Sequence, residues 1–280
     1  MSEISVIIPT FQPGEYLFDC IKSLEIQTLD KKRFEVIIIL NGAKEPFFAK
    51  ITEYISNSEL DFKLYYSESP GVSNARNIGL NHVESTYIAF VDDDDVVSKG
   101  YLERLLVVAE NDSIVISNSK TFKDDIHQTG NDYISTTYNR FRNTKSISLL
   151  NGRRFFSNSC GKLIPLSIIG KTRFDNRISK GEDSVFMMEI SRNISKVLIS
   201  SNEAIYYIRL RSGSATRKKR KLSEITCTKY YELKKYFSFL LKIPPSYNFF
   251  FVGIMIATSL KSFIEDIYSS VRFSIVIRRN

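Results

Sequence analysis

Four consecutive aspartates, residues 92–95, end the segment "TYIAFVDDDD" after an apolar run. Carboxylates crowded at the end of a buried strand repel one another and lose hydration, so solvent or a cation must compensate. An Asp-x-Asp pair at a strand end presents hard oxygen ligands, which Mg²⁺ and Mn²⁺ prefer and can share with substrate phosphates. Asp92 and Asp94 are therefore candidate metal ligands. The alternative is a solvated acidic turn, in which Asp95 caps a helix starting near Ser98.

A second acidic pair, Glu182 and Asp183, lies in "GEDSVF" at the expected start of a helix. A base that takes a proton from a substrate hydroxyl is commonly a carboxylate, and repulsion from a neighbour such as Glu182 would raise the pKa of Asp183. Acidic residues are also common in the first turn of a helix because of the helix dipole. Taken alone, this pair favours the structural interpretation.

Composition limits the class of protein. The chain has 280 residues, of which 43% are hydrophobic and 25% charged, as in ordinary globular domains. The opening "MSEISVIIPT" has no Lys or Arg before a short apolar run, so we expect no secretory signal and a cytoplasmic protein. Cys20, Cys160 and Cys227 are too far apart for a disulfide framework or a CxxC metal site, and we expect them to be reduced packing residues.

The elements that must position the acidic residues alternate between strand and helix over residues 1–118. Apolar runs rich in β-branched residues are typical of buried parallel strands, and they occur at 4–9, 34–40, 62–67, 86–91 and 113–118. Helices are predicted between them at 14–27, 45–55, 71–83 and 101–110. Gly79 is expected to let its helix pack closely on the sheet. An α/β sheet of this kind binds its ligand beyond the carboxyl ends of the strands, where the aspartates lie.

The second half of the chain gives weaker signals. Residues 119–160 are polar and rich in Asn and Thr, and we interpret them as a lid or an acceptor-side loop. A helix is predicted at 181–194, followed by strands at 197–201 and 204–211. Residues 222–280 are predicted to form two helices broken by "IPPS", because paired prolines cannot continue a helix.

Charge and apolarity are concentrated near the carboxyl terminus. The net charge is +8, and residues 209–221 contain seven basic side chains, which points to an anionic partner. No aromatic or helical reading module accompanies them, so we expect no binding to nucleic acid. The apolar stretch 248–260 is shorter than the roughly 20 residues of a membrane span. Two interpretations stay open for it: packing on the domain, or peripheral contact with a membrane surface helped by the basic flanks.

The segments "SVIIPTFQPGEYLFDCIKSLEIQT", "SPGVSNARNIGLNHVESTYIAFVDDDD" and "GEDSVF" occur in the order and spacing of family 2 glycosyltransferases, and the resemblance extends over residues 3 to about 215. "SCGKLIPLSII" and "YYIRLRSGSATRK" also resemble bacterial polysaccharide-synthesis members. The resemblance implies the GT-A fold, a Rossmann-like nucleotide-binding α/β sheet flanked by helices, here with a C-terminal helical extension. It implies a donor-binding half at 1–118, an acceptor-binding and catalytic-base half of the same domain at 119–221, and the extension at 222–280.

The resemblance also implies roles at the donor site. Pro9, Thr10 and Phe11 should border the base and ribose of a nucleotide-sugar donor. Asn41 stands where relatives often have an Asp that hydrogen-bonds the base. An amide both donates and accepts hydrogen bonds, so it is compatible with uracil, and a UDP-sugar is the favoured donor. The departure from Asp nevertheless leaves the identity of the base undecided. Arg76 matches the family's "ARN" arginine, which approaches the nucleotide. The alternative for Arg76 is an ordinary arginine on a helix surface.

Around the diphosphate, the resemblance implies that Asp92 and Asp94 bind Mn²⁺ or Mg²⁺, which would stabilise the charge of the departing group. Asp93 alternates to the other side of the strand and would face the sheet edge or the ribose. Arg211 and Ser214 match a loop that closes over the donor diphosphate in relatives, where a cation and a hydroxyl would bind phosphate oxygens.

On the acceptor side, the resemblance makes Asp183 the catalytic base, with Glu182 beside it. Lys162 is expected either to contact phosphate or an acidic acceptor, or to be solvated at a helix start. The implied reaction moves one sugar, with inversion, to a hydroxyl of a saccharide, of which a lipid-linked one is an option. Two alternatives remain: a phosphatase of the haloacid dehalogenase type with Asp92 as nucleophile, and a non-catalytic saccharide-binding module. The phosphatase motif normally follows the first strand, which argues against that alternative here.

Overall fold

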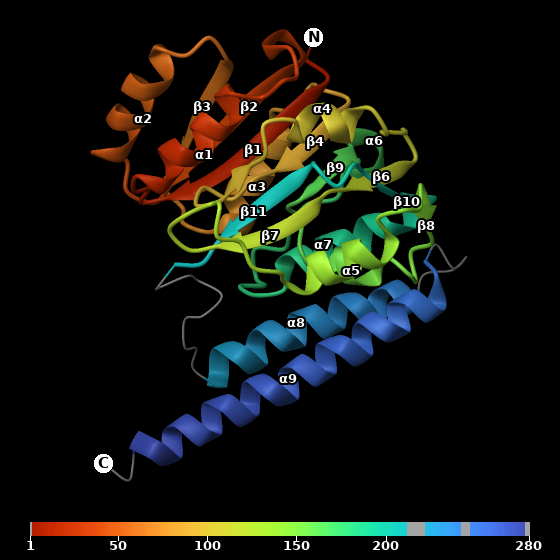
Figure 1. Cartoon of the computed structure of the whole chain (residues 1–280). Coiled ribbons are helices and arrows are strands. Elements are labelled where there is room, and N and C mark those ends of the chain that lie inside the picture. The colour runs from red at the N-terminus through yellow and green to blue at the C-terminus, as the bar shows by residue number, and fades with distance from the viewer. Residues whose placement is uncertain (1, 212–221, 242–246, 278–280) are drawn as a thin grey trace.

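The structure is a computed structural model that describes residues 2–211, 222–241 and 247–277. Its larger sheet is built from β1 (Ile4–Phe11), β2 (Phe34–Asn41), β3 (Asp61–Ser67), β4 (Tyr87–Phe90), β6 (Ser113–Ile116), β8 (Ser146–Ile147), β9 (Lys162–Pro165) and β10 (Lys196–Ile199). Within the described residues these strands lie in the order β3-β2-β1-β4-β9-β6-β10-β8 (Figure 1). A smaller sheet has the order β5-β11-β7, from β5 (Val96–Val97), β7 (Asn118–Phe122) and β11 (Ile205–Arg209).

The first half has the alternation that the sequence predicts. Strands β1 to β4 are parallel, and α1 (Tyr16–Glu25), α2 (Phe47–Ser56) and α3 (Val72–Asn81) connect them. All eight residues of β2 are buried, as expected for a strand in the middle of a parallel sheet. The close approach expected at Gly79 is confirmed, because a Cβ on Gly79 would lie 2.6 Å from Cγ2 of Ile7.

Residues 119–160 are not the irregular loop that the sequence suggested. They contain β7, the helix α5 (Tyr133–Phe141), the strand β8 and a 3₁₀ helix, η2 (Arg153–Ser157). A capping box between Asp132 and Ser135 starts α5. Beyond them, β9 lies antiparallel between β4 and β6, and so joins the two halves in one sheet. The strands among these elements have only two to five residues, and α5 has only three core-facing apolar residues at helical spacing, Ile134, Tyr138 and Phe141, set among Ser, Thr and Asn, so the signal in the sequence is weak.

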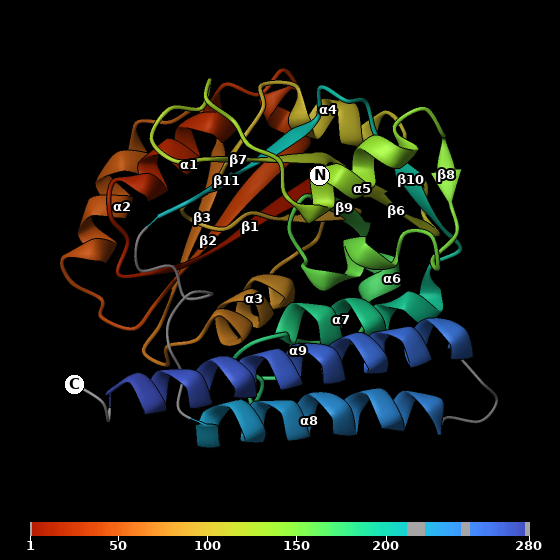
Figure 2. The same ribbon diagram turned by 60° about the horizontal axis from the view of Figure 1, so that its bottom comes forward.

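The remaining helices cover the two sides of the sheet. They are α4 (Tyr101–Leu106), α6 (Leu166–Ile169), α7 (Glu182–Ile190), α8 (Leu222–Leu240) and α9 (Phe249–Ile277), with the short 3₁₀ helices η1 (Lys31–Arg33) and η3 (Ser191–Asn193). Figure 2 shows α3 and α7 between the sheet and the paired helices α8 and α9, with α1 and α4 on the other side. The two C-terminal helices are as predicted, and the "IPPS" segment that should separate them lies outside the described residues.

The α8–α9 hairpin, as we call this pair of helices, packs on the domain. Phe251 and Val252 of α9 are fully buried, and the rings of Phe251 and Phe156 are in edge contact with centroids 5.0 Å apart. The outer surface differs, because the neighbouring Phe249 and Phe250 are 66% and 74% exposed. Among the described residues no helix is both long and apolar enough to cross a membrane. One face of the hairpin thus packs as the first interpretation expects, and another remains apolar and exposed.

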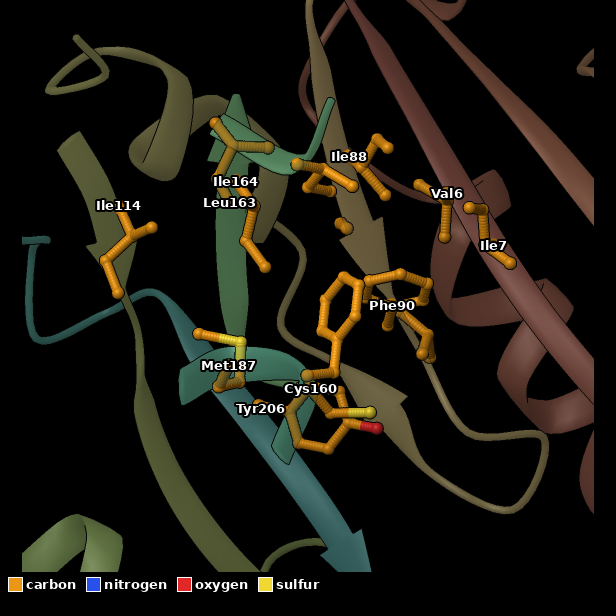
Figure 3. Close-up of a cluster of buried hydrophobic side chains, with 14 of the residues drawn as sticks. Val6, Ile7, Ile88, Phe90, Ile114, Cys160, Leu163, Ile164, Met187 and Tyr206 are labelled. Atoms are coloured by element: carbon orange, nitrogen blue, oxygen red, sulfur yellow. The ribbon is translucent and has the colours of Figure 1, made fainter. Parts of the chain in front are cut away.

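The core runs under the candidate site. Figure 3 shows side chains from β1, β4, β6 and β9 meeting Met187 of α7 and Tyr206 of β11. Cys20 and Cys160 are buried in this core, as expected. Cys227 is instead exposed on α8, because it lies on the side of that helix turned away from the domain, so the expectation of a packing role was wrong for this residue.

Candidate active site

The carboxyl ends of three parallel strands meet at one edge of the sheet. Thr10 at the end of β1 donates a hydrogen bond from its hydroxyl to Oδ2 of Asp93, which follows β4. Asn41 ends β2, where its Nδ2 donates to the carbonyl of Thr10 (2.7 Å) and its Oδ1 accepts from the amide of Gly71 (2.8 Å). Asn41 is 2% exposed, so in this structure its amide joins the two strands to the start of α3. Contact between Asn41 and a base stays a prediction.

Arg76 of α3 brings the two acidic pairs together. Its Nη2 lies 2.9 Å from Oδ1 of Asp92, while its Nη1 lies 2.8 Å from Oδ1 of Asp183 and 3.5 Å from Oε1 of Glu182. The residue is 2% exposed, which excludes the alternative of an ordinary surface arginine. Burial opposes its charge, but Asp183 and Asp92 outweigh burial and raise the pKa of Arg76. A permanent cation therefore lies between the predicted metal pair and the predicted base.

Burial and mutual repulsion both act against negative charge in the aspartate run. Burial, opposed by the hydrogen bond from Thr10 and reinforced by repulsion from Asp94 and Asp92, raises the pKa of Asp93 to about 6. Burial and the charge of Asp92 likewise raise the pKa of Asp94. Carboxylates in this condition are stabilised by a cation placed among them.

Asp95 does not cap a helix, contrary to our expectation. It is 5% exposed, and its Oδ1 accepts a hydrogen bond of 2.8 Å from the amide of Arg209 in β11. Helix α4 begins only at Tyr101, after Gly100, and no side chain caps it. The reason is that β5 follows Asp95 and pairs with β11, which carries this part of the chain away from the helix start.

Strand β11 supports the aspartate turn through residues that sequence reasoning missed. The hydroxyl of Tyr206 accepts a hydrogen bond from the amide of Asp92 (3.0 Å), and Nε of Arg209 donates to the carbonyl of Asp94 (2.9 Å). The Arg209 guanidinium lies 4.6 Å from the ring centroids of both Tyr16 and Phe122. Arg209 stands two residues before Arg211 in the segment predicted as a strand, and this spacing was the available signal, although β11 itself ends at Arg209.

Arg211 reaches the same turn. Its Nε lies 2.5 Å from Oδ2 of Asp94 in an ion pair, so a guanidinium of the chain neutralises one member of the predicted metal pair. Ser214, predicted to act with it, lies outside the described residues.

Asp183 is the second residue of α7, where the helix begins after Gly181 in a left-handed conformation (φ 87°). Its Oδ1 accepts hydrogen bonds from Arg76 and from the hydroxyl of Ser159 (2.9 Å), and no described residue donates to its Oδ2. Ser159 was also missed, although it lies in the quoted segment "SCGKL". Burial, and then repulsion from Asp183, raises the pKa of Glu182 to about 7.

Two predicted contacts, Phe11 and Lys162, lie in opposite environments, and only that of Lys162 differs from expectation. Phe11 is 51% exposed, and its ring lies over Gly42, where a Cβ would come within 2.5 Å of that ring. Lys162 is the first residue of β9 rather than a residue at a helix start, and it is 1% exposed. Its ammonium donates to Oδ1 of Asn158 and to the carbonyl of Cys160, and burial lowers the pKa of Lys162 to about 8. Pro9 is buried in β1.

The carboxylates fit a divalent cation only in part. Among the residues that the structure describes, no three His, Cys, Asp or Glu side chains are arranged to hold a metal. Asp92 and Asp94 do offer hard oxygens, and the Asp92 side chain is 41% exposed. Mg²⁺ is typically held by one or two carboxylates together with substrate phosphates and water. The site therefore fits a metal whose remaining ligands come from a phosphate-bearing substrate.

Charged side chains at the carboxyl ends of the parallel strands lie at the edge where an open α/β sheet binds its ligand. A family model described as Glycosyl transferase family 2 matches residues 5–170, more than half of the chain. The chain belongs to this family, and that membership leaves the phosphatase alternative without support.

Relatives agree with the family assignment. The chain is 29% identical over 227 residues to glycosyltransferase GlyA of Streptococcus pneumoniae, covering 77% of this chain and 32% of GlyA. It is 25% identical over 217 residues to the poly(ribitol-phosphate) beta-N-acetylglucosaminyltransferase TarS of Staphylococcus aureus, covering 76% of this chain and 36% of TarS. The chain thus spans about a third of the length of these curated relatives.

Solved structures support the fold. The crystal structure of S. aureus TarS 1–349 in complex with UDP-GlcNAc superimposes with a TM-score of 0.68 at 20% identity, covering 95% of this chain and 81% of that chain. The complex of the same fragment with UDP gives a TM-score of 0.64 at 21% identity, covering 84% of this chain and 69% of that chain. The likeness confirms the predicted α/β fold of the GT-A type with its helical C-terminal region.

Proposed function

We propose that this protein transfers one sugar from a nucleotide-diphosphate-sugar donor to a hydroxyl of a saccharide acceptor in the synthesis of a bacterial surface polysaccharide. The observation that carries the proposal is Arg76, which links Asp92 at the carboxyl edge of the sheet to Asp183 at the start of α7. The guanidinium of Arg76 would then lie between the donor phosphate, near Asp92, and the acceptor hydroxyl, near Asp183. Family membership supports the sugar transfer, and the TarS complexes with UDP and UDP-GlcNAc make a UDP-sugar the favoured donor.

The donor would lie over the ends of β1 and β2. The exposed ring of Phe11 offers a face to the base, Asp93 lies beside Thr10 where a ribose would border it, and Arg211 is near enough to bind phosphate oxygens after leaving Asp94. Asp92 and Asp94 would hold Mn²⁺ or Mg²⁺. When bound, such a cation supplies positive charge to the departing diphosphate.

Asp183 would act as the base through Oδ2, because Arg76 and Ser159 both occupy Oδ1 and thereby orient the carboxylate. Glu182, whose pKa is raised to about 7, would be only partly ionised near neutral pH and so would add less negative charge beside Asp183 than an ordinary glutamate. Lys162 is buried too deeply to contact the substrate directly. We propose that it supports the segment carrying Ser159 through its hydrogen bond to Asn158.

Thermal-shift screening of UDP-, GDP-, CMP- and dTDP-sugars, with and without Mn²⁺, tests the donor proposal. We expect a UDP-sugar to give the largest stabilisation and the shift to require the divalent ion. Transfer of the sugar from the bound donor to an acceptor or to water, detected as released UDP, then tests for turnover. A chain that binds a donor and never releases UDP would instead support the non-catalytic saccharide-binding module.

We further propose that the exposed face of the α8–α9 hairpin contacts the inner face of the cell membrane, where a lipid-linked acceptor would be found. Large apolar side chains are exposed on both helices, among them Phe237, Phe250, Ile264 and Tyr268. The chain carries +8 net charge with a basic run just before α8, which suits an anionic lipid surface.

Vesicle sedimentation tests this contact. The double substitution Phe250→Ser and Ile264→Ser should lower binding to vesicles of phosphatidylglycerol and leave stability nearly unchanged, since both side chains are exposed. The matched control is Val107→Ser, an exposed apolar position (79%) directly after α4, which lies on the side of the sheet opposite to the hairpin (Figure 2). Equal sedimentation of the double variant and the wild type would contradict the proposal.

A further inference from the structure

Residues on both sides of Glu182 and Asp183 contact the α8–α9 hairpin. The hydroxyls of Ser179 and Thr228 lie 3.0 Å apart, and the hydroxyl of Tyr236 lies 3.2 Å from that of Ser184. One residue before Gly181, Lys180 forms an ion pair of 3.2 Å with Asp266 of α9. The turn that presents the proposed base is therefore contacted by side chains of α8 and α9 that follow their partners by 49, 52 and 86 positions in the sequence.

Glu232 of α8 packs directly against the backbone of this turn. A Cβ on Gly181 would lie 3.5 Å from Cδ and Oε1 of Glu232, so the carboxylate rests against the amino-terminal end of α7. Negative charge is favoured there by the helix dipole. Lys229 holds the carboxylate in place, since its Nζ lies 2.6 Å from Oε2 of Glu232 and also donates to the hydroxyl of Ser259 on α9 (3.0 Å).

These polar groups are buried, which is unusual for a helix that only covers a domain. Thr228, Lys229, Glu232 and Tyr236 are 6%, 8%, 5% and 1% exposed. Buried ion pairs contribute little net stability compared with apolar residues of similar size, and their best-attested role is to fix one arrangement of the surrounding elements. The arrangement fixed here is that of α8 against the start of α7.

We infer that Thr228, Glu232 and Tyr236 form a clamp that positions Asp183 for catalysis. We call these three residues the turn clamp, and they are positioning residues because none of them reaches the reacting atoms. The inference rests on the proposed role of Asp183 as base. It makes the α8–α9 hairpin part of the catalytic unit, since a base misplaced by about 1 Å can lose a hundredfold in rate.

Tyr236→Phe removes only the hydroxyl that contacts Ser184, and Tyr230→Phe on the exposed side of the same helix is its matched control. The rate of UDP release is measured from UDP-GlcNAc, or from the donor that gives the largest thermal shift, and is normalised to the stoichiometry of UDP binding. We expect kcat of Tyr236→Phe to fall about tenfold, with the donor KM and UDP stoichiometry within about twofold of wild type. Tyr230→Phe should match the wild type.

A double-mutant cycle with Ser184→Ala separates positioning from general loss of stability. If the two hydroxyls act together, the double variant should lose no more kcat than either single variant does. Additive losses, or a loss of kcat in proportion to lost UDP stoichiometry, would overturn the clamp.

Amide hydrogen exchange tests the clamp without any assay of transfer. Peptides that contain residues 179–184 should exchange faster in Tyr236→Phe than in Tyr230→Phe, because the start of α7 has lost a partner. Unchanged exchange in this turn overturns the clamp, whereas a wild-type protein that releases no UDP from any donor overturns the proposed function.

Discussion

At the scale of single residues, Asp183 and Asp94 carry different parts of the proposed reaction. Asp183→Asn keeps an oxygen able to accept the hydrogen bonds of Arg76 and Ser159, but it removes the basic carboxylate. We therefore expect donor binding to persist and kcat for sugar transfer to fall by about 10²- to 10⁴-fold. Calorimetric titration with UDP and Mn²⁺, beside the transfer assay, measures both quantities.

The matched substitution is Asp94→Ala. It removes a proposed metal ligand, so nucleotide binding should become weak and no longer depend on the divalent ion.

Turnover by Asp183→Asn close to that of the wild type would show that another group acts as the base.

Glu182 gives the site a pH dependence of known sign. Its folded-state pKa is raised from 4.5 to about 7 by burial and by Asp183, so the folded chain binds this proton more tightly than the unfolded chain. Its stabilising contribution is complete below about pH 4.5 and is lost as the pH rises through about 7.

Because glutamine does not ionise, Glu182→Gln should lose less stability than the wild type as the pH rises. Its free energy of unfolding should exceed that of the wild type at pH 8 by up to about 3 kcal/mol, and the difference should shrink toward pH 5. Urea unfolding at the two pH values measures it. Glu59→Gln, at a surface ion pair, is the control, because the pKa of Glu59 is lowered and it titrates below this range. A constant difference from pH 5 to 8 would contradict the prediction.

At the scale of elements, helix α3 carries Arg76 and must lie close to the sheet. Gly79 permits this approach, since a methyl group there would lie 2.6 Å from Ile7 and 3.0 Å from Ile39. Gly79→Ala should destabilise the protein by about 1–3 kcal/mol through overpacking and should also displace Arg76. Urea unfolding and donor binding test the two effects.

Gly253→Ala is the opposite case and serves as its control. Gly253 lies in helix α9, and nothing is within 4 Å of the position its Cβ would take. Alanine is the better helix former, so this variant should be as stable as the wild type or more stable by up to about 1 kcal/mol. If both variants lost equal stability, close packing at Gly79 would not be the cause.

At the scale of the whole molecule, the α8–α9 hairpin and the sheet domain share one core. Phe251 is fully buried against Phe156, whereas the adjacent Phe250 is 74% exposed. Phe251→Ala should lower the free energy of unfolding of the entire chain by about 3–5 kcal/mol, and Phe250→Ala should change it by less than about 0.5 kcal/mol.

A single unfolding transition is expected in both variants. The chain has no tryptophan, so circular dichroism and the fluorescence of its 15 tyrosines are the suitable probes. Two separated transitions, with only the first affected by Phe251→Ala, would mean that the hairpin folds as an independent unit.

The sequence by itself determined the features that depend on local pattern. Periodicity and residue type over short stretches of sequence predict the buried strands at 4–9 and 34–40 and the helix with Gly79. They also place the aspartates directly after an apolar strand. The edge of the sheet that holds the site follows as well, because parallel strands carry their carboxyl ends to one side. The strand β9 was missed because it has only four residues, and helix α5 because only Ile134, Tyr138 and Phe141 mark its apolar face among polar residues.

The tertiary structure alone decided which side chains meet. Arg76 pairs with Asp92, 16 residues away, and with Asp183, 107 residues away, while Asp95 binds the amide of Arg209 instead of capping a helix. Tyr236 likewise reaches Ser184 from a separate helix. Contacts of this kind depend on how distant segments pack, and local propensity holds no information about that packing.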